Sequence, residues 1–171
     1  MLSIGGCANT PASKEEGVVY RAVDSIWTQQ VGHGTEGKHL LHNPVVEGER
    51  LYAVSYRDIV AFERNSGKEL WRSKHDRAIN TGVVIAGELL LFGGDAEVVA
   101  ISRTTGELIW RAEVNSEVLA APVVAGGLVV VRTVDGNLTA HAIDSGKLRW
   151  SYQFRVPVLT LRGDAPSMSQ R

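Results

Sequence analysis

Short stretches of apolar and β-branched residues alternate with glycine-containing turns along most of the chain. Between residues 122 and 154 these stretches are 122–124, 128–133, 138–143 and 148–154. The pairs that separate them are Gly126-Gly127, Asp135-Gly136 and Ser145-Gly146. Glycine supplies the positive φ angles that tight hairpins need, and no 11-residue window keeps a helical period free of such breakers. The pattern therefore predicts four short strands and no helix.

A longer pattern recurs at a step of about 40 residues. Segment 61–71 reads Ala, four residues, Ser, Gly, three residues and Trp, and segments 100–110 and 140–150 repeat it with Ser or Thr. Segments 44–48, 83–87 and 122–126 keep the same step, so the whole unit repeats. Four strands per unit of this length predict an all-β fold made of β-propeller blades.

The recurring tryptophans and glycines are interpreted as packing residues. The inner strands are apolar on nearly every residue, so neighbouring sheets are expected to bury both of their faces. Each repeated Trp begins the outermost strand of its blade, and its ring can lie flat against small Ala and Gly positions of the adjacent blade. An earlier tryptophan is expected in a separate strand that completes the last blade of a closed ring. The docking set is Trp27, Trp71, Trp110, Trp150, Gly67, Gly106 and Gly146.

Composition and charge argue against several classes of function. The chain has 171 residues with 18 Lys and Arg against 19 Asp and Glu, so its net charge of −1 does not favour nucleic acid. No apolar run approaches the ~20 residues that span a bilayer. His33, His39 and His42 match no strong zinc spacing and are interpreted as solvated loop residues, so no metal site is predicted.

The start of the chain resembles a bacterial lipobox. An apolar residue, two small residues and the single cysteine follow one another as Ile4-Gly5-Gly6-Cys7. Cys7 is therefore the candidate lipidation site, and Ala8 in place of an aspartate favours the outer membrane. A full signal peptide does not fit upstream of Cys7. The alternative is that Cys7 is an ordinary residue of a terminal tail.

The Ala-x4-Ser/Thr-Gly-x3-Trp repeat resembles the tryptophan-docking repeat of the pyrroloquinoline-quinone-type propellers. Within that superfamily the chain resembles, from about residue 26 to 165, the BamB family of the outer-membrane β-barrel assembly machine. The lipobox-like start, the isolated Trp strand and the Leu-x-Leu-Arg-Gly segment at 159–163 carry this resemblance. It implies a palmitate-carrying lipoprotein on the periplasmic face of the outer membrane. It further implies a non-enzymatic scaffold that assists β-barrel insertion by binding the BamA subunit, without cofactor or small-molecule substrate.

The resemblance implies that Leu159, Leu161 and Arg162 contact the periplasmic domains of BamA. In an extended segment the two leucines point to one face and Arg162 to the other, and arginine is enriched at interface hot spots. From the residue pattern alone, the alternative is that both leucines face the core of the next blade.

The family resembles eight-bladed rings, which need about twice this length. The sequence therefore predicts an incomplete propeller of about three blades with flanking strands. The blades are expected at 43–74, 82–114 and 121–154 within a repeat region of 25–165. A lipobox-like start and linker occupies 1–24 and a tail occupies 166–171.

Two other functions stay open: a fragment of a periplasmic quinone-dependent dehydrogenase, and a propeller that binds another periplasmic protein. The dehydrogenase chemistry needs a carboxylate base, basic groups for the cofactor and usually Ca²⁺. Asp95, Glu97 and Asp135 lie in expected hairpins and are interpreted as turn residues. No carboxylate cluster stands out, so no catalytic residue is predicted.

Overall fold

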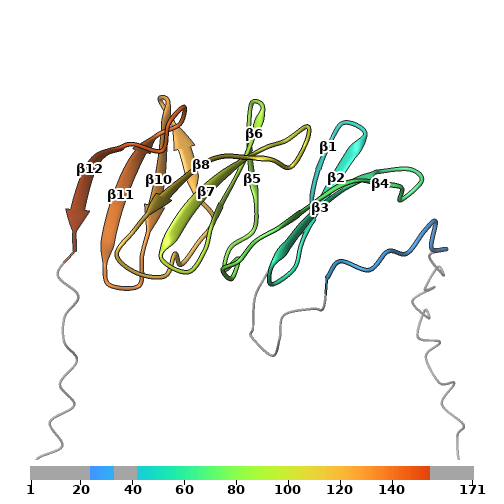
Figure 1. The fold of residues 1–171 in the computed structure, drawn as a ribbon, viewed down its shortest axis with the longest axis horizontal. Coiled ribbons are helices and arrows are strands. Elements are labelled where there is room, and N and C mark those ends of the chain that lie inside the picture. The colour runs from blue at the N-terminus through green and yellow to red at the C-terminus, as the bar shows by residue number, and fades with distance from the viewer. Residues whose placement is uncertain (1–23, 33–41, 155–171) are drawn as a thin grey trace, which may run out of the picture.

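The computed structural model describes residues 24–32 and 42–154. Within these residues, twelve strands form three separate four-stranded antiparallel sheets, which lie side by side in chain order (Figure 1). The described residues contain no helix. The all-β repeat of four-stranded units predicted from the sequence is confirmed. The separate strand predicted around Trp27 is not: residues 24–32 form no strand, because no described strand pairs with them.

Each sheet is a meander of consecutive strands. The first sheet contains β1 (Val45–Glu47), β2 (Arg50–Val54), β3 (Asp58–Glu63) and β4 (Glu69–Lys74). The second contains β5 (Val84–Ala86), β6 (Leu89–Gly93), β7 (Glu97–Ser102) and β8 (Leu108–Glu113). The third contains β9 (Val123–Ala125), β10 (Leu128–Arg132), β11 (Asn137–Ala142) and β12 (Leu148–Gln153).

A β-bulge occurs at the same point of every sheet. Ala61 of β3 pairs with Trp71 of β4, but the next residue, Phe62, pairs with Glu69, so Leu70 has no residue opposite it. The register shifts at the equivalent point of the second and third sheets. Two residues of the outer strand thus oppose one residue of the inner strand, as in other antiparallel bulges.

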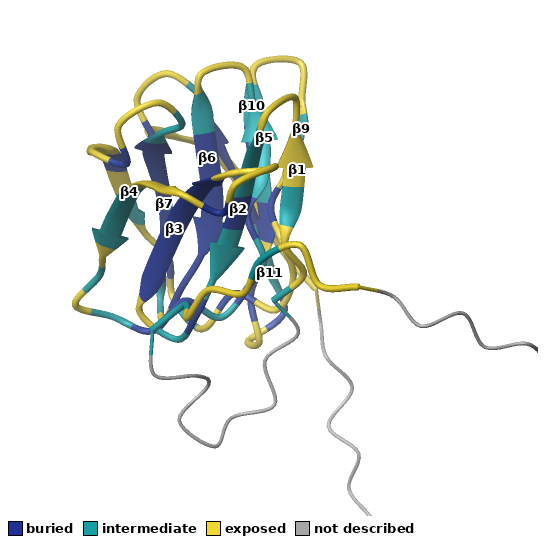
Figure 2. Cartoon of the chain, turned by 90° about the vertical axis from the view of Figure 1, so that its right-hand side faces the viewer, coloured by how far each residue is buried: buried dark blue, intermediate teal, exposed yellow. Residues whose placement is uncertain are grey.

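The second sheet is buried on both faces because it lies between the other two. Alternate side chains of a strand point to opposite faces, so β6 and β7 contribute to two separate cores. Figure 2 shows buried segments in β3, β6 and β7, with exposed turns at the ends of the sheets. Burying one large aliphatic or aromatic side chain contributes about 1.5–3 kcal/mol to stability. One core contains Tyr52, Ile59, Ile79, Leu90, Phe92, Val99 and Ile101, and the other contains Leu91, Val98, Ala100, Trp110, Val118, Val129 and Val131.

The outer strands begin two residues before the tryptophans that were expected to open them, although the start of β12 at Leu148 agrees with the segment 148–154. Strand β4 starts at Glu69, so Trp71 is its third residue rather than its first. The same holds for the tryptophans of β8 and β12. The prediction that Trp opens the strand was wrong. Beyond the bulge, the residue two positions before each tryptophan already pairs with the inner strand.

Candidate functional site

Each tryptophan but the last lies against the glycine turn of the following sheet. A Cβ built on Gly67 would come within 2.5 Å of the Trp27 ring, and one on Gly106 within 2.5 Å of the Trp71 ring. The indole N–H of Trp27 donates to the carbonyl of Arg64 at 2.8 Å, and that of Trp71 to the carbonyl of Arg103 at 3.2 Å. The two contacts fix the ring in both position and orientation.

The third such contact joins the second and third sheets. A Cβ on Gly146 would come within 2.6 Å of the Trp110 ring, whose N–H donates to the carbonyl of Ile143 at 2.8 Å. Trp110 is 7% exposed, whereas Trp150 is 42% exposed. No sheet within residues 24–32 and 42–154 covers the outer face of β12, where every residue is exposed. The strand therefore leaves a row of large side chains accessible: Leu148, Trp150 and Tyr152, followed by Phe154.

Several residues that the sequence singled out lie outside the described residues. They are the partner-binding candidates Leu159, Leu161 and Arg162, the lipidation candidate Cys7, and the loop histidines His33 and His39.

His42 is described, and its surroundings differ from the expected solvated loop. Both of its ring nitrogens are buried. Desolvation lowers the pKa of His42, and the backbone of Ile79 partly offsets this effect. The interpretation of His42 as a solvated residue was wrong, because its ring turns toward the segment between the first and second sheets.

A buried carboxylate lies at the seam between the first two sheets. Glu97 is 1% exposed, and its Oε2 lies 3.3 Å from Nε of Arg111 and 3.5 Å from Nη1 of Arg77. Burial raises the pKa of Glu97, while the two guanidinium groups pull it down. The interpretation of Glu97 as a turn residue was wrong: it is the first residue of β7, and its side chain points inward.

The charged cluster around Glu97 ties the linker after β4 to the second sheet. Arg111 of β8 also pairs with Asp76 at 3.1 Å, and its hydrogen bond lowers the pKa of that carboxyl. Arg77 reaches Glu113 at 3.8 Å. Two arginines thus neutralise a carboxylate that would otherwise be costly to bury.

One signal in the sequence could have revealed the buried acid. The 39-residue step places Glu97 at the position of Asp58, which is also buried and also the first residue of its strand. The same step places Arg111 at the position of Arg72, whose pKa is raised mainly by its hydrogen bond to Glu69 and, to a smaller extent, by the charge of Asp58. A buried acid thus opens the third strand of both the first and the second sheet, although Arg72 pairs with Glu69 rather than with Asp58.

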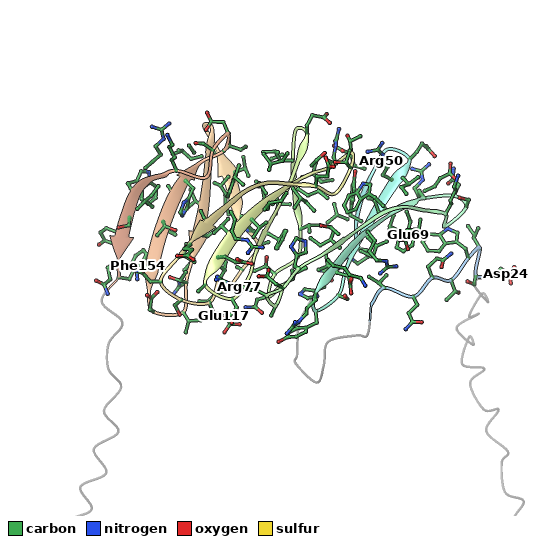
Figure 3. All side chains as sticks on the ribbon, in the orientation of Figure 1. Asp24, Arg50, Glu69, Arg77, Glu117 and Phe154 are labelled. Atoms are coloured by element: carbon green, nitrogen blue, oxygen red, sulfur yellow. The ribbon has the colours of Figure 1, made fainter. Side chains whose placement is uncertain are left out.

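A cleft opens between the same two sheets at the other end of their strands. Its volume is about 490 Å³, and it is lined by Glu47, Gly48, Glu49, Arg50, Tyr52, Arg103 and Thr104. Figure 3 shows Arg50 on the opposite side of the sheets from Arg77 and Glu117. The seam between the first and second sheets therefore carries charged groups at both ends.

Arg103 bridges the two sheets at this cleft. It forms an ion pair with Glu47 of the first sheet, and its Nη2 lies 3.0 Å from Glu88 of the second. Arg50 reaches across the seam in the other direction, where its Nη1 donates to the carbonyl of Arg103 at 3.3 Å. Two arginines and several carboxylates thus surround a space that no described side chain fills.

Two features are absent from the described part of the chain. No three or more His, Cys, Asp or Glu side chains there converge to hold a metal ion. A helix long and apolar enough to cross a membrane is likewise not found in residues 24–32 and 42–154.

The chain is similar in sequence to two curated proteins. It is 33% identical over 144 residues to the outer membrane protein assembly factor BamB of Burkholderia pseudomallei, covering 84% of this chain and 37% of that protein. It is 33% identical over 174 residues to the BamB of Bordetella pertussis, covering 96% of this chain and 44% of that protein. The chain thus spans less than half the length of these relatives.

Solved structures share its fold. BamB from Moraxella catarrhalis superposes with a TM-score of 0.60 at 23% identity, over 66% of this chain and 35% of that one. A quinohemoprotein alcohol dehydrogenase from Comamonas testosteroni superposes with a TM-score of 0.58 at 18% identity, over 67% of this chain and 21% of that one. Both similarities concern the fold, which is common to propellers with and without enzymatic activity.

Residues 55–169 match the model of the family described as outer membrane protein assembly factor BamB. This match extends over most of the chain and agrees with the curated relatives and with the spacing of the docked tryptophans. The chain belongs to the BamB family.

Proposed function

We propose that this chain serves as a non-enzymatic scaffold in outer membrane protein assembly and acts by binding a BamA subunit. The observation that carries the proposal is the family match over residues 55–169, which includes the Leu159-Thr160-Leu161-Arg162 segment. Two leucines beside an arginine have the composition of an interface anchor.

The architecture suits a scaffold. The second sheet is buried on both faces, and an indole joins each sheet to the next through a ring contact and a hydrogen bond. A rigid body of this kind presents its turns and edges at fixed positions, so a partner binds without a large ordering cost. In this proposal the sheets hold the contact segment and take no part in chemistry.

The proposed location is the periplasmic face of the outer membrane. The lipobox-like segment ending at Cys7 supports attachment of a lipid there. Mass spectrometry of the chain expressed with a lipoprotein signal peptide tests this part: acylation of Cys7, lost in Cys7→Ser, is the expected result. An unmodified Cys7 in the membrane fraction would remove the anchor from the proposal.

The partner site is tested by pulldown with the purified periplasmic domains of BamA. Replacing Leu159→Ala, Leu161→Ala and Arg162→Glu together is expected to weaken capture at least about tenfold, because hot-spot residues carry most interface energy. Far-UV circular dichroism should be unchanged. Capture equal to that of the unsubstituted chain would reject these three residues as the site.

A matched control removes the same kinds of side chain elsewhere. Leu70→Ala, Leu108→Ala and Arg149→Glu replace two exposed leucines and one exposed arginine on the three outer strands. Capture by this control is expected to stay within about twofold of the unsubstituted chain, since none of these residues belongs to the proposed contact segment.

The fold shared with a quinohemoprotein alcohol dehydrogenase supports a second candidate, a dehydrogenase fragment. That function predicts reduction of an artificial dye by an alcohol when pyrroloquinoline quinone and Ca²⁺ are added. A folded chain without such activity would remove this candidate and leave the scaffold proposal untouched.

A further inference from the structure

The two seams between the sheets differ in chemistry at equivalent positions of the repeat. At the second seam, Ala86 and Leu89 of the second sheet and Ile143 of the third pack against the apolar core. The repeat step places Glu47 and Arg50 at the positions of Ala86 and Leu89. Three apolar side chains that close one seam are therefore charged at the other, where Arg103 takes the place of Ile143.

The backbone supports this alignment. The amide of Arg103 donates to the carbonyl of Glu88 at 2.9 Å, and the amide of Ile143 donates to the carbonyl of Gly127 at 3.0 Å. Arg103 and Ile143 thus follow the third strand of their sheets at the same structural position. The cleft at the first seam is thus lined by Arg50 and Arg103, whose counterparts at the second seam are Leu89 and Ile143.

Of the two arginines that line the cleft, only Arg103 forms ion pairs with described carboxylates. Arg103 is paired with Glu47 and Glu88, and Glu49 is paired with Arg64 at 3.0 Å and accepts from Asn65 at 3.0 Å. Among the described residues, Arg50 forms no ion pair, and its guanidinium donates to a neutral carbonyl. A partly buried cation without a carboxylate partner favours an anion from outside.

We propose that this cleft binds an acidic side chain of an extended peptide, with its carboxylate on the guanidinium of Arg50. The site shares no residue with the proposed BamA contact segment, and nothing in that function requires it.

The surroundings of Arg50 favour a peptide over a denser anion. Glu47 and Glu49 line the same cleft and would repel a polyphosphate or nucleic acid, whereas a single carboxylate can pair with Arg50 between them. The volume of about 490 Å³ lies in the range of ligand pockets and exceeds what one carboxylate needs. Gly48 also lines the cleft, so its backbone amide lies where a bound peptide would affect it.

The test is a two-dimensional NMR titration of the 171-residue chain. The probe is the peptide acetyl-Ala-Ala-Glu-Ala-Ala-amide, and its counterpart carries Gln in place of the Glu residue. The Arg50 Nε–H and Gly48 amide signals are expected to shift saturably with the acidic peptide. The Gln peptide is expected to bind at least about fivefold more weakly, since it lacks the charge that pairs with Arg50.

Substitutions of Arg50 test whether the peptide binds in the cleft. Arg50→Leu introduces the residue found at the matching position of the second sheet and is expected to lower the affinity at least about fivefold. Arg50→Gln gives the same loss without adding apolar surface, which covers the case in which the leucine variant does not fold. Arg149→Leu removes an exposed arginine of the third sheet and should bind within about twofold of the unsubstituted chain.

Three outcomes would overturn the proposal. They are equal binding by a folded Arg50 variant, equal binding of the Gln peptide, and equal shifts with acetate or inorganic phosphate at the peptide concentration. The last outcome identifies a general anion site rather than a peptide site. None of them bears on BamA capture, which is measured with the substitutions at residues 159–162.

Discussion

The ring of Trp71 lies so close to Gly106 that no side chain fits between them. A Cβ on that glycine would come within 2.5 Å of the ring, and the indole N–H donates to the carbonyl of Arg103 three residues earlier. Gly106 also has a φ of +76°, which residues with a Cβ rarely adopt. At the seam between the first two sheets, the glycine turn thus provides both the flat surface for the indole ring and the carbonyl that accepts its hydrogen bond.

Gly106→Ala is therefore expected to destabilise the chain by about 2–4 kcal/mol, because the added methyl group both clashes with the indole and strains the turn. Urea unfolding followed by tryptophan fluorescence measures the change. Gly87→Ala is the matched control: its φ is +59° and an added Cβ meets nothing within 4 Å. The control should lose only about 1 kcal/mol. Equal losses in both variants would show that turn strain alone accounts for the effect.

Trp110→Ala is expected to cost far more stability than Trp150→Ala. Trp110 is 7% exposed and fills the seam between the second and third sheets, whereas Trp150 is 42% exposed. Truncating a buried aromatic typically costs about 3–5 kcal/mol, and we expect less than about 2 kcal/mol at the exposed position. Thermal unfolding of the two variants in the same buffer provides the comparison. A Trp150→Ala variant as unstable as Trp110→Ala would contradict this account.

Glu97→Gln is expected to change how stability depends on pH. Burial raises the pKa of Glu97, so the folded chain holds this proton more tightly than the unfolded chain. The contribution of Glu97 to stability therefore falls as pH rises from about 4.5 through the raised pKa. Since glutamine does not titrate, the variant should gain stability relative to the unsubstituted chain across this window.

Urea unfolding at several pH values between 4.5 and 8 measures this difference. Glu113→Gln serves as the control, because Glu113 is 83% exposed and lies 3.8 Å from the same Arg77. Its stability difference from the unsubstituted chain should stay nearly constant with pH. A difference that is constant for Glu97→Gln as well would argue against a raised pKa at the seam.

His75 gives a pH dependence of the opposite sign. Its ring lies 4.8 Å from that of Phe92, and burial together with the charge of Arg111 lowers its pKa. The unfolded chain then binds the proton more tightly, so stability is lost as pH falls below about 6.5 toward the lowered pKa. His75→Val, which introduces the residue at the matching position of the next repeat, should remove this loss.

Melting temperatures at pH 7.5 and 5.5 show whether the imidazole is responsible. Ser73→Ala removes the hydroxyl 3.2 Å from Nε2 of His75 but keeps the ring, so it should retain the acid-side loss. A His75→Val variant that loses as much stability between the two pH values as the unsubstituted chain would assign the effect to other groups.

The repeat was sufficient to predict the sheets and the order of their strands. The tryptophan of each unit and the small residues around it recur at nearly constant spacing. Because equivalent units stack on one another, equivalent residues of the sequence occupy equivalent positions in successive sheets. Within the described residues, the strands of the third sheet start and end within one residue of the segments read from the apolar pattern. The local pattern of apolar residues and turns is sufficient to predict strand bounds when each strand pairs with the next one in the sequence.

The charged seam could not be predicted in the same way. Glu97 follows a turn and is polar, so local chemistry indicates exposure, yet Arg77 from the linker and Arg111 from β8 surround it. Its burial depends on the approach of one sheet to the next, which no single repeat contains. The cleft at Arg50 escaped prediction for the same reason, since its walls come from two sheets.

Because of the bulge opposite Phe62, the number of residues between Ala61 and Trp71 matters as well as the identity of Gly67. Side chains along a strand alternate sides, so a one-residue deletion within this interval would turn the indole away from the glycine of the following sheet. The three copies keep an interval of identical length, although only the glycine and a Ser or Thr recur between its ends. Substitutions there, apart from the glycine, are expected to change stability by small amounts, but deletion of a single codon would remove the indole contact between two sheets.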